Sequence, residues 1–266
     1  MGDVNHLRIA ISIFYCLAAL LTGWASANVT VDGDLTRLFD THAGAVITDE
    51  LELRNPGDTD AQVHIYLTDY AFSADGTSEY PEPGTLDRSN TEWMSLNTAP
   101  VVVPARGSVQ LPYSIEVPDD ADAGSFWSVI MVEQVQPAPE AGDGLTLTTV
   151  VRYGVQVVTT LSGAPAELSF VNPAFTSVDG TSQLTVDIEN TGLVSLRAGH
   201  YVDLFDSAGE ALGRFEGAFR RIHPGTSVRQ SFELGSLAAG SYVAVVVADA
   251  GGENVFGAQY NLNVNP

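Results

Sequence analysis

The sequence predicts an all-β protein built from two tandem immunoglobulin-like β-sandwich domains. Short runs of alternating or apolar residues follow one another between clusters of turn residues, with no helical period. Roughly seven such runs in each of two units of about 100 residues is the pattern of an immunoglobulin-like sandwich, with a small barrel or a jelly roll as alternatives. Three phrases typical of strand ends and turns also occur twice, in the same order. They pair Leu51–Gly57 with Val186–Gly192, Pro104–Val109 with Pro224–Val228, and Ala123–Phe126 with Ala239–Tyr242.

Residues 1–27 read as a signal peptide that is removed from the folded protein. Arg8 precedes an apolar run from Ile9 to Leu21, and Ala25–Ala27 supplies small residues for cleavage. The single cysteine, Cys16, falls inside this segment, so we expect the exported chain to have neither a disulfide nor a thiol nucleophile. The expected location is the periplasm, the cell surface or the medium. No later segment is apolar for long enough to span a membrane.

The chain is strongly acidic, with 11 Lys+Arg against 33 Asp+Glu and a formal net charge of −22. All the basic residues are arginines. Such a surface repels nucleic acid and anionic lipid, which argues against both as partners. Calcium or a basic partner would explain the acidity, but adaptation to high salt is the simpler explanation, because counterions screen the self-repulsion. The composition is therefore interpreted as halophilic.

The first unit is predicted to cover residues 28–162. Its Asn55–Asp60 segment is rich in residues that favour tight turns. The almost wholly apolar run from Phe126 to Val135 predicts a central strand that is buried on both faces. The strands expected in this unit are 45–54, 61–70, 108–117, 126–135 and 145–160.

The last of these strands has the longest alternation in the chain, which is typical of a strand with one wet face. One face collects the apolar residues Leu145, Leu147, Val151, Tyr153, Val155 and Val157. The other face holds the polar or small residues Thr146, Thr148, Arg152, Gly154 and Gln156.

Gly163–Pro165 reads as a linker, and the second unit is predicted to cover residues 166–266. The segment between Asn55 and Ser108 is longer than its counterpart between Asn190 and Ser227, which predicts an insertion near 73–96 in the first unit. Insertions on a rigid sandwich often carry binding, and a neutral surface loop is the alternative. The strands expected in the second unit are 168–170, 183–189, 201–206, 227–234, 242–249 and 259–264.

The sequence contains no motif of catalysis, and we expect neither an enzyme nor a cofactor nor a metal. There is no nucleophile elbow, zinc-protease motif, phosphate loop or dinucleotide fingerprint. The histidines that follow the signal peptide are not spaced as metal ligands; they are His42, His64, His200 and His223. Acidic clusters such as Asp119–Asp122 lack a calcium loop and are expected from the composition, so a calcium-dependent module or a hydrolase is a minor alternative.

Two arginines are candidates for partner binding. Arg37 lies in the first strand region, and Arg152 projects from the polar face of the long alternating strand. If these two strands lie near the cleft between the domains, both guanidiniums can converge on one carboxylate and anchor a chain terminus. The alternative is that each arginine only neutralises nearby acid.

These residues resemble those of periplasmic pilus-assembly chaperones of the PapD-like type. The resemblance rests on Thr36–Phe39, Leu51–Asn55, the Arg152-Tyr153 strand and the presence of a second sandwich. It implies that Arg37 and Arg152 grip the C-terminal carboxylate of a pilin-like subunit. It also implies that Leu145, Leu147 and Val151 lie along a strand that completes the fold of that subunit. The chain departs from the family where Gly-Val-Gln, with no proline, follows Tyr153.

The first unit is also similar to the immunoglobulin-like surface proteins that interact with WxL proteins and peptidoglycan. Trp93–Leu96, Pro104–Val109 and Val117–Phe126 carry this similarity. Trp93 is then either a platform for a sugar or partner, or a plug at the end of the sandwich. Trp127 lies in the predicted central strand, where packing in the core is expected.

The leading expectation is a non-enzymatic, exported envelope protein that binds an extracytoplasmic protein subunit, pilin-like or a surface protein, by strand addition. The alternative is an adhesion or scaffold module that binds cell-wall polymer or a surface protein through the insertion near 73–96. The residues expected to bind the partner are Arg37, Arg152, Leu145, Leu147, Val151 and Trp93.

Overall fold

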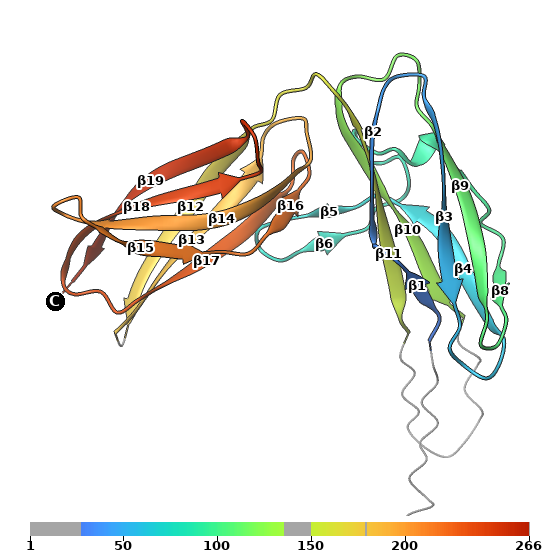
Figure 1. Ribbon diagram of the computed structural model, residues 1–266, viewed down its shortest axis with the longest axis horizontal. Helices are drawn as coiled ribbons and strands as arrows, with labels where there is room; N and C mark the ends of the chain where they lie inside the picture. Colours follow the sequence, from blue (N-terminus) through green and yellow to red (C-terminus); the bar gives the residue numbers. More distant parts are fainter. Residues whose placement is uncertain (1–27, 136–149, 179, 266) are drawn as a thin grey trace, which may run out of the picture.

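The computed structural model describes residues 28–135, 150–178 and 180–265 and contains two β-sandwiches joined by a short linker (Figure 1). The predicted signal peptide and the candidates Leu145 and Leu147 lie outside these residues. Within the described part, the helical content is one 3-10 turn, η1 (Thr91–Trp93). The all-β prediction is confirmed.

The first sandwich packs two main sheets face to face. One sheet has the order β1 (Thr30–Asp32), β3 (Val46–Arg54), β9 (Ser108–Glu116) and β7 (Met94–Leu96). The other has the order β2 (Thr36–Thr41), β11 (Arg152–Leu161), β10 (Gly124–Gln134), β4 (Ala61–Thr68) and β8 (Val101–Val103). A two-stranded hairpin, β5 (Ala71–Phe72) and β6 (Ser78–Glu79), extends toward the second sandwich (Figure 1).

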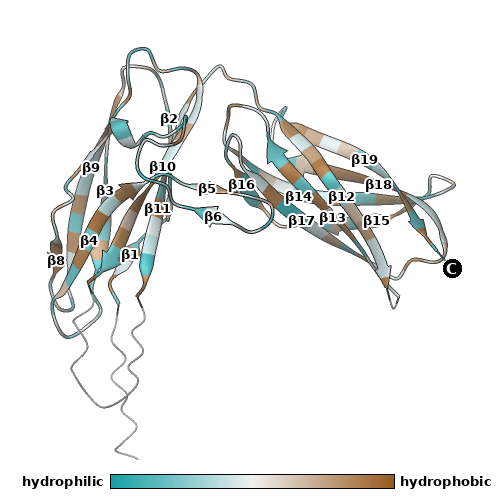
Figure 2. Cartoon of the chain, turned by 180° about the vertical axis from the view of Figure 1, so that it is seen from behind, coloured by the Kyte–Doolittle hydropathy of each residue, from teal (hydrophilic) through white to brown (hydrophobic). Residues whose placement is uncertain are grey.

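Alternation along the strands builds the core of the first sandwich. Leu51 and Leu53 of β3 face Val155 and Val157 of β11 across the sandwich, and all four are fully buried. Strand β10 is buried along most of its length between β11 and β4, as its apolar run predicts. The strongest hydrophobic bands accordingly lie on the strands of both sandwiches (Figure 2).

Strand β2 sets the geometry of the candidate site, because it is parallel to β11 and pairs with only part of it. The register runs from Thr36 opposite Gln156 to Thr41 opposite Leu161. The other strand pairs of the two main sheets are antiparallel.

The second sandwich also consists of two sheets. The smaller has the order β12 (Leu168–Val178), β13 (Thr181–Asn190) and β17 (Ser227–Gly235). The larger has the order β15 (Ala211–Glu216), β14 (Leu196–Asp206), β18 (Gly240–Asp249) and β19 (Val255–Val264), and β16 (Arg220–Ile222) also pairs with β14. Strands β15 and β16 were not among the predicted strands.

The repeated phrases fold in the same way in the two sandwiches. The side-chain amide of Asn55 donates to the carbonyls of Thr59 and Val103, at 2.8 and 3.0 Å, and its oxygen accepts from the amide of Gly57. The amide of Asn190 donates to the carbonyls of Val194 and Ile222, both at 2.8 Å, and its oxygen accepts from the amide of Gly192. Both asparagines are buried, so each repeat fixes the turn that follows a core strand.

The segment 73–96, predicted as a loop excursion, consists mainly of turns and irregular backbone with three short elements. It contains β6, η1 and β7, and β7 pairs with β9 in a main sheet. The buried carboxylate of Asp69 organises the rest by accepting hydrogen bonds from Leu86 N at 2.7 Å, Gly84 N at 3.2 Å and Ser89 Oγ at 2.5 Å.

Candidate functional site

The free edge of β11 is the structural feature that best fits a strand-adding site. Strand β2 covers β11 only from Gln156 onward, and no described strand pairs with the outer side of Arg152 to Val155. The amide of Gln156 donates to the carbonyl of Leu35 at 2.9 Å, on the β2 side. Because backbone groups alternate in direction along a strand, the N–H and C=O of Gly154 and Arg152 point to this same side, where they are open.

Arg152 lies at the start of this free edge and is held by an ion pair. Its Nε is 2.7 Å from Glu133 Oε2, on the neighbouring strand β10. Tyr66 of β4 donates to the same carboxylate oxygen at 3.2 Å. The side chain of Arg152 is 57% exposed, so its guanidinium remains accessible to a partner.

Arg37 points instead toward the other sheet of its sandwich. Its Nε lies 3.8 Å from Asp49 Oδ2 of β3, is buried, and has no hydrogen-bond partner among the described residues. The hydroxyl of Tyr113 donates to the same Asp49 oxygen at 2.7 Å. Arg37 therefore contributes a contact between the two sheets of the first sandwich.

The structure does not bring the two candidate arginines together. Arg37 lies opposite Val157 in the β2–β11 register, five residues along β11 from Arg152. At roughly 3.3 Å per residue, this separates their backbones by about 17 Å. Each guanidinium contacts its own carboxylate, Asp49 for Arg37 and Glu133 for Arg152.

The remaining candidates divide between exposed and packed positions. Val151 is half-buried, and Val150 beside it is 46% exposed, just before the free edge. Trp93 packs against the core of the first sandwich, and its ring centroid lies 4.5 Å from that of Phe126.

The contact between the sandwiches is made by residues that were not predicted from the sequence to lie together. Trp127 is buried as predicted, but outside the core, where its indole stacks on His223 of the second sandwich. The amide of Ser195 donates to Ser125 Oγ at 2.8 Å, and the amide of Ser125 donates to the carbonyl of Leu193 at 2.8 Å. The hairpin β5–β6 adds a hydrogen bond from Ala74 N to Ser227 Oγ at 3.0 Å.

Ser195 and His223 form a serine–histidine pair, with 2.8 Å between Oγ and Nδ1. His223 Nε2 lies 3.2 Å from Gln156 Oε1, and this carbonyl oxygen requires a donor, so Nδ1 accepts from Ser195. The imidazole is fully buried between Trp127 and its own loop, and burial lowers its pKa to about 3. A pair enclosed in this way has no room for a substrate and serves the contact between the sandwiches.

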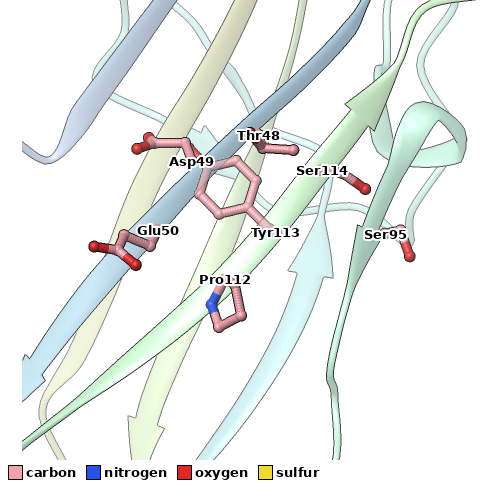
Figure 3. Close-up of a pocket in the computed structure, with 7 residues that line it drawn as sticks. All are labelled: Thr48, Asp49, Glu50, Ser95, Pro112, Tyr113 and Ser114. Atoms are coloured by element: carbon pink, nitrogen blue, oxygen red, sulfur yellow. The ribbon is translucent and has the colours of Figure 1, made fainter.

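A hollow of about 590 Å³ opens on the sheet of β3, β9 and β7 (Figure 3). Its walls carry hydroxyls and two carboxylates, from Thr48, Asp49, Glu50, Ser95, Tyr113 and Ser114, together with the ring of Pro112. Burial and the hydrogen bond to Asp49 raise the pKa of Tyr113 far above its ordinary value, so this phenol stays protonated. None of the residues that line the hollow is a histidine, and its Asp49 carboxylate accepts a hydrogen bond from the Tyr113 hydroxyl at 2.7 Å.

Two further properties bear on function. Among the described residues, no three His, Cys, Asp or Glu side chains gather in a way that would hold a metal ion. The same part of the chain has no helix with the length and apolar character needed to cross a membrane.

The structure is similar to solved structures of fimbrial chaperones. The class 5 fimbriae chaperone CfaA has a TM-score of 0.50 and 13% identity, and the match covers 87% of this chain and 98% of that one. A chain of the chaperone–tip adhesin complex of CFA/I fimbriae has a TM-score of 0.48 and 14% identity, covering 88% and 98%. The chaperone DraB of E. coli has a TM-score of 0.41 and 13% identity, covering 90% and 98%. The likeness to CfaA confirms the expected fold.

Sequence comparison adds nothing to this likeness. No protein-family model matches the chain. No curated protein matches it either.

Proposed function

We propose that this chain is an exported, non-enzymatic, chaperone-like protein that binds a β-rich envelope subunit by strand addition. The observation that carries the proposal is the free edge of β11, where Arg152 and Gly154 present open backbone groups. An open edge is a template for another strand, because the partner satisfies donors and acceptors that otherwise need water. The shared fold with a fimbriae chaperone supports the same class of function.

The apolar row that precedes the free edge extends the proposed contact. Leu145, Leu147 and Val151 share one face in the sequence pattern, and we assign to this face the side chains that enter the partner. Val151 belongs to the described part of this row and is half-buried. Tyr153 and Val155, on the same face, already pack on the core of the first sandwich.

Arg152 is the arginine that this proposal retains for direct contact with the partner. Its guanidinium is exposed beside the free edge, so a partner carboxylate can share it with Glu133. Arg37 takes a positioning role through its contact with Asp49 of the other sheet.

Two substitutions of Arg152 distinguish the contribution of its backbone N–H to partner binding from that of its side chain. Arg152→Pro removes the open N–H together with the guanidinium, whereas Arg152→Ala removes only the guanidinium. Proline is tolerated at a strand edge where no ladder hydrogen bond is lost, so we expect both variants to fold. The measurement is co-purification of the tagged protein from its own envelope at native salt, with thermal unfolding of each variant as the folding control.

Strand addition predicts that a small β-rich exported subunit binds the wild type, binds Arg152→Ala less tightly, and is lost from Arg152→Pro. Equal loss in both variants would make the guanidinium the main anchor and the backbone edge secondary. Retention of the subunit by folded Arg152→Pro, or recovery of cell-wall fragments alone, would overturn strand addition at this edge.

The insertion near 73–96 remains the basis of the adhesion alternative, but no observation favours it. Part of the insertion contacts the second sandwich, through Ala74 and Ser227. Another part folds on the buried carboxylate of Asp69, and Trp93 packs on Phe126.

A further inference from the structure

Strand β18 of the second sandwich is apolar on both faces, although only one of its faces meets the core. Its residues Tyr242–Ala248 form an unbroken apolar run. The core face of this run holds three fully buried residues, Ala244, Val246 and Ala248. The opposite face holds Val243, Val245 and Val247, which are half-buried and form what we call the valine row. A strand with one wet face normally alternates apolar with polar residues, so the core does not explain this row.

The corresponding strand of the first sandwich shows the same pattern with its outer face covered. Strands β10 and β18 both begin within the repeated phrases Ala123–Phe126 and Ala239–Tyr242. The residues of β10 that point away from the core are Trp127, Val129 and Met131, which are 4%, 1% and 7% exposed. Part of their cover comes from the second sandwich, where His223 stacks on Trp127. By contrast, no described strand lies over the valine row, because the sheet of β12, β13 and β17 packs on the other side of β18 (Figure 1).

The neighbouring strands extend the valine row into a wider face. On β14, the half-buried Tyr201 and Phe205 lie opposite Val247 and Val243. On β19, the exposed Gly257 and Gln259 lie opposite Val247 and Val245. Residues directly opposite each other in adjacent strands share one face of a sheet. The valine row therefore lies between a row of large side chains and a row that contains a glycine and an amide.

The centre of this face carries no net charge. Asp203 of β14 lies opposite Val245, and its two carboxylate oxygens accept hydrogen bonds from Nε and Nη2 of Arg214 at 2.7 and 2.8 Å. The guanidinium of Arg214 also lies 3.7 Å from the ring centroid of Tyr201. In a chain with a formal net charge of −22, a neutral face is one at which a second copy of the chain meets little repulsion.

The face is large enough for a two-fold contact. Strands β14, β18 and β19 have 11, 10 and 10 residues, and the shorter β15 lies beside β14. At about 3.3 Å per residue and about 4.8 Å between strands, the face measures roughly 30 Å by 20 Å. Two such faces would together bury about 1,200 Å², which lies at the lower limit for a specific, stable interface. A dimer of moderate, micromolar affinity is therefore expected.

We propose that a second copy of this chain covers this face, so that the valine rows of two copies pack on each other in a two-fold dimer. A two-fold axis parallel to β18 places β14 of one copy over β19 of the other at the same level of the strands. Tyr201 then meets Gly257, and the Asp203–Arg214 pair meets Gln259. Large side chains thus face small or polar ones. The contact leaves the free edge of β11 open, so the inference does not depend on the proposed function.

Sedimentation velocity over a range of protein concentrations in molar NaCl tests the dimer. Val245 is the central residue of the row, and Val245→Arg would set two guanidiniums against each other across the axis. This substitution makes the chain less negative, so a general decrease in repulsion between copies would strengthen association rather than weaken it. We expect the wild type to dimerise and Val245→Arg to dimerise at least tenfold more weakly, about 1.4 kcal/mol. The matched control is Val102→Arg, on β8 of the first sandwich, where Val102 is 54% exposed; it should keep the wild-type affinity.

Cross-linking tests which face makes the contact. The chain contains no cysteine after the predicted signal peptide, so Val245→Cys introduces a single thiol. Packed sheets lie about 10 Å apart, and a bis-maleimide of about that span should therefore link two copies of Val245→Cys. Val102→Cys, treated at the same concentration, should remain unlinked. Thermal unfolding by circular dichroism checks that each variant folds, and Val245→Thr, which keeps the shape of the side chain, replaces Val245→Arg if that variant does not fold.

The proposal is overturned if the wild type remains a monomer at every soluble concentration, or if folded Val245→Arg dimerises as tightly as the wild type. Equal cross-linking of Val245→Cys and Val102→Cys would also overturn it. Arg152→Pro should dimerise normally, and a monomeric Arg152→Pro would place the contact between copies at the edge of β11 instead. If the wild type is a monomer and Val245→Arg loses the co-purified subunit, the face binds that subunit and the dimer is wrong. None of these results changes the comparison of Arg152→Ala with Arg152→Pro, which tests strand addition.

Discussion

The imidazole of His223 lies flat against the indole of Trp127, with 4.6 Å between the ring centroids and 9° between the ring planes. Trp127 belongs to β10 of the first sandwich, and His223 follows β16 of the second. This stack and the contacts of His223 with Ser195 and Gln156 hold the two sandwiches against each other at this point. Burial, and after it the charge of Arg221, lowers the pKa of the ring and so favours the neutral imidazole in this contact.

This stack makes stability depend on pH. Burial lowers the pKa of His223 to about 3 in the folded protein, against about 6.5 for an unperturbed histidine. Between these values the unfolded state binds more protons, so the stabilisation is complete above about pH 6.5 and is lost as the pH falls toward 3. One proton contributes at most about 1.4 kcal/mol per pH unit. Unfolding free energies at pH 7, 6 and 5 should show this slope.

The His223→Gln variant isolates this contribution from that of the carboxylates. It should be less stable at pH 7, and the difference from wild type should shrink as the pH falls to 5. His42→Gln, at an exposed position, is the control and should keep the wild-type slope. Parallel pH profiles for wild type and His223→Gln would refute the role assigned to this ring.

Gly124 offers a separate test of the contact between the sandwiches. It has a φ of +123°, and a Cβ there would lie 2.6 Å from the carbonyl oxygen of Leu193 in the second sandwich. Gly124→Ala should therefore separate the sandwiches locally and increase the radius of gyration in small-angle scattering.

The matched control is Gly209→Ala. Gly209 has a φ of +83°, but no atom lies within 4 Å of the position that a methyl group would take there. Its substitution therefore adds backbone strain alone, about 1–2 kcal/mol. Both variants should melt earlier, and only Gly124→Ala should change the scattering. An unchanged scattering profile for folded Gly124→Ala would show that the contact tolerates the methyl group.

The repeated phrases made the fold predictable from the sequence. Asn55 and Asn190 recur with the same turn residues because each must satisfy buried carbonyls after a core strand. The alternation around Arg152 likewise predicts that this side chain points to solvent, because Tyr153 and Val155 on the opposite face of the strand pack on the core. Strand β15 escaped prediction because Gly213 interrupts its alternation, and β16 because three residues are too few to show a period.

Substitution of the two asparagines should cost similar free energies. Asn55→Ala and Asn190→Ala each remove three side-chain hydrogen bonds and leave buried carbonyls without a donor. We expect a loss of about 2–4 kcal/mol for each variant in urea unfolding. Asn261→Ala, at an exposed position of β19, should change stability by less than about 0.5 kcal/mol. A small loss at one asparagine would show that the two turns are not energetically equivalent.

The candidate site was less predictable, because it depends on register and on contacts between distant residues. The sequence assigns Arg37 and Arg152 to the first and last strands of the first unit, but only the pairing of Arg37 with Val157 shows that they lie apart. The contact between the sandwiches likewise joins Trp127 to His223, which are distant in the sequence.

The acidity predicts that the folded state requires salt. With a formal net charge of −22, the compact chain repels itself more strongly than the expanded unfolded chain. The Debye length falls from about 10 Å at 0.1 M to about 3 Å at 1 M, so NaCl should raise the melting temperature steadily. Each kcal/mol gained corresponds to about 2–4 °C for a protein of this size.

Comparing the melting temperature in CaCl₂ with that in NaCl distinguishes charge screening from specific calcium binding. Screening predicts that millimolar CaCl₂ adds no more stability than NaCl of equal ionic strength, and that a chelator has no effect in molar NaCl. Stabilisation by calcium well above that of NaCl would instead favour a specific site among the acidic clusters. A melting temperature that does not change between low and molar NaCl would refute the halophilic interpretation, because the repulsion would then have little effect on the folded state.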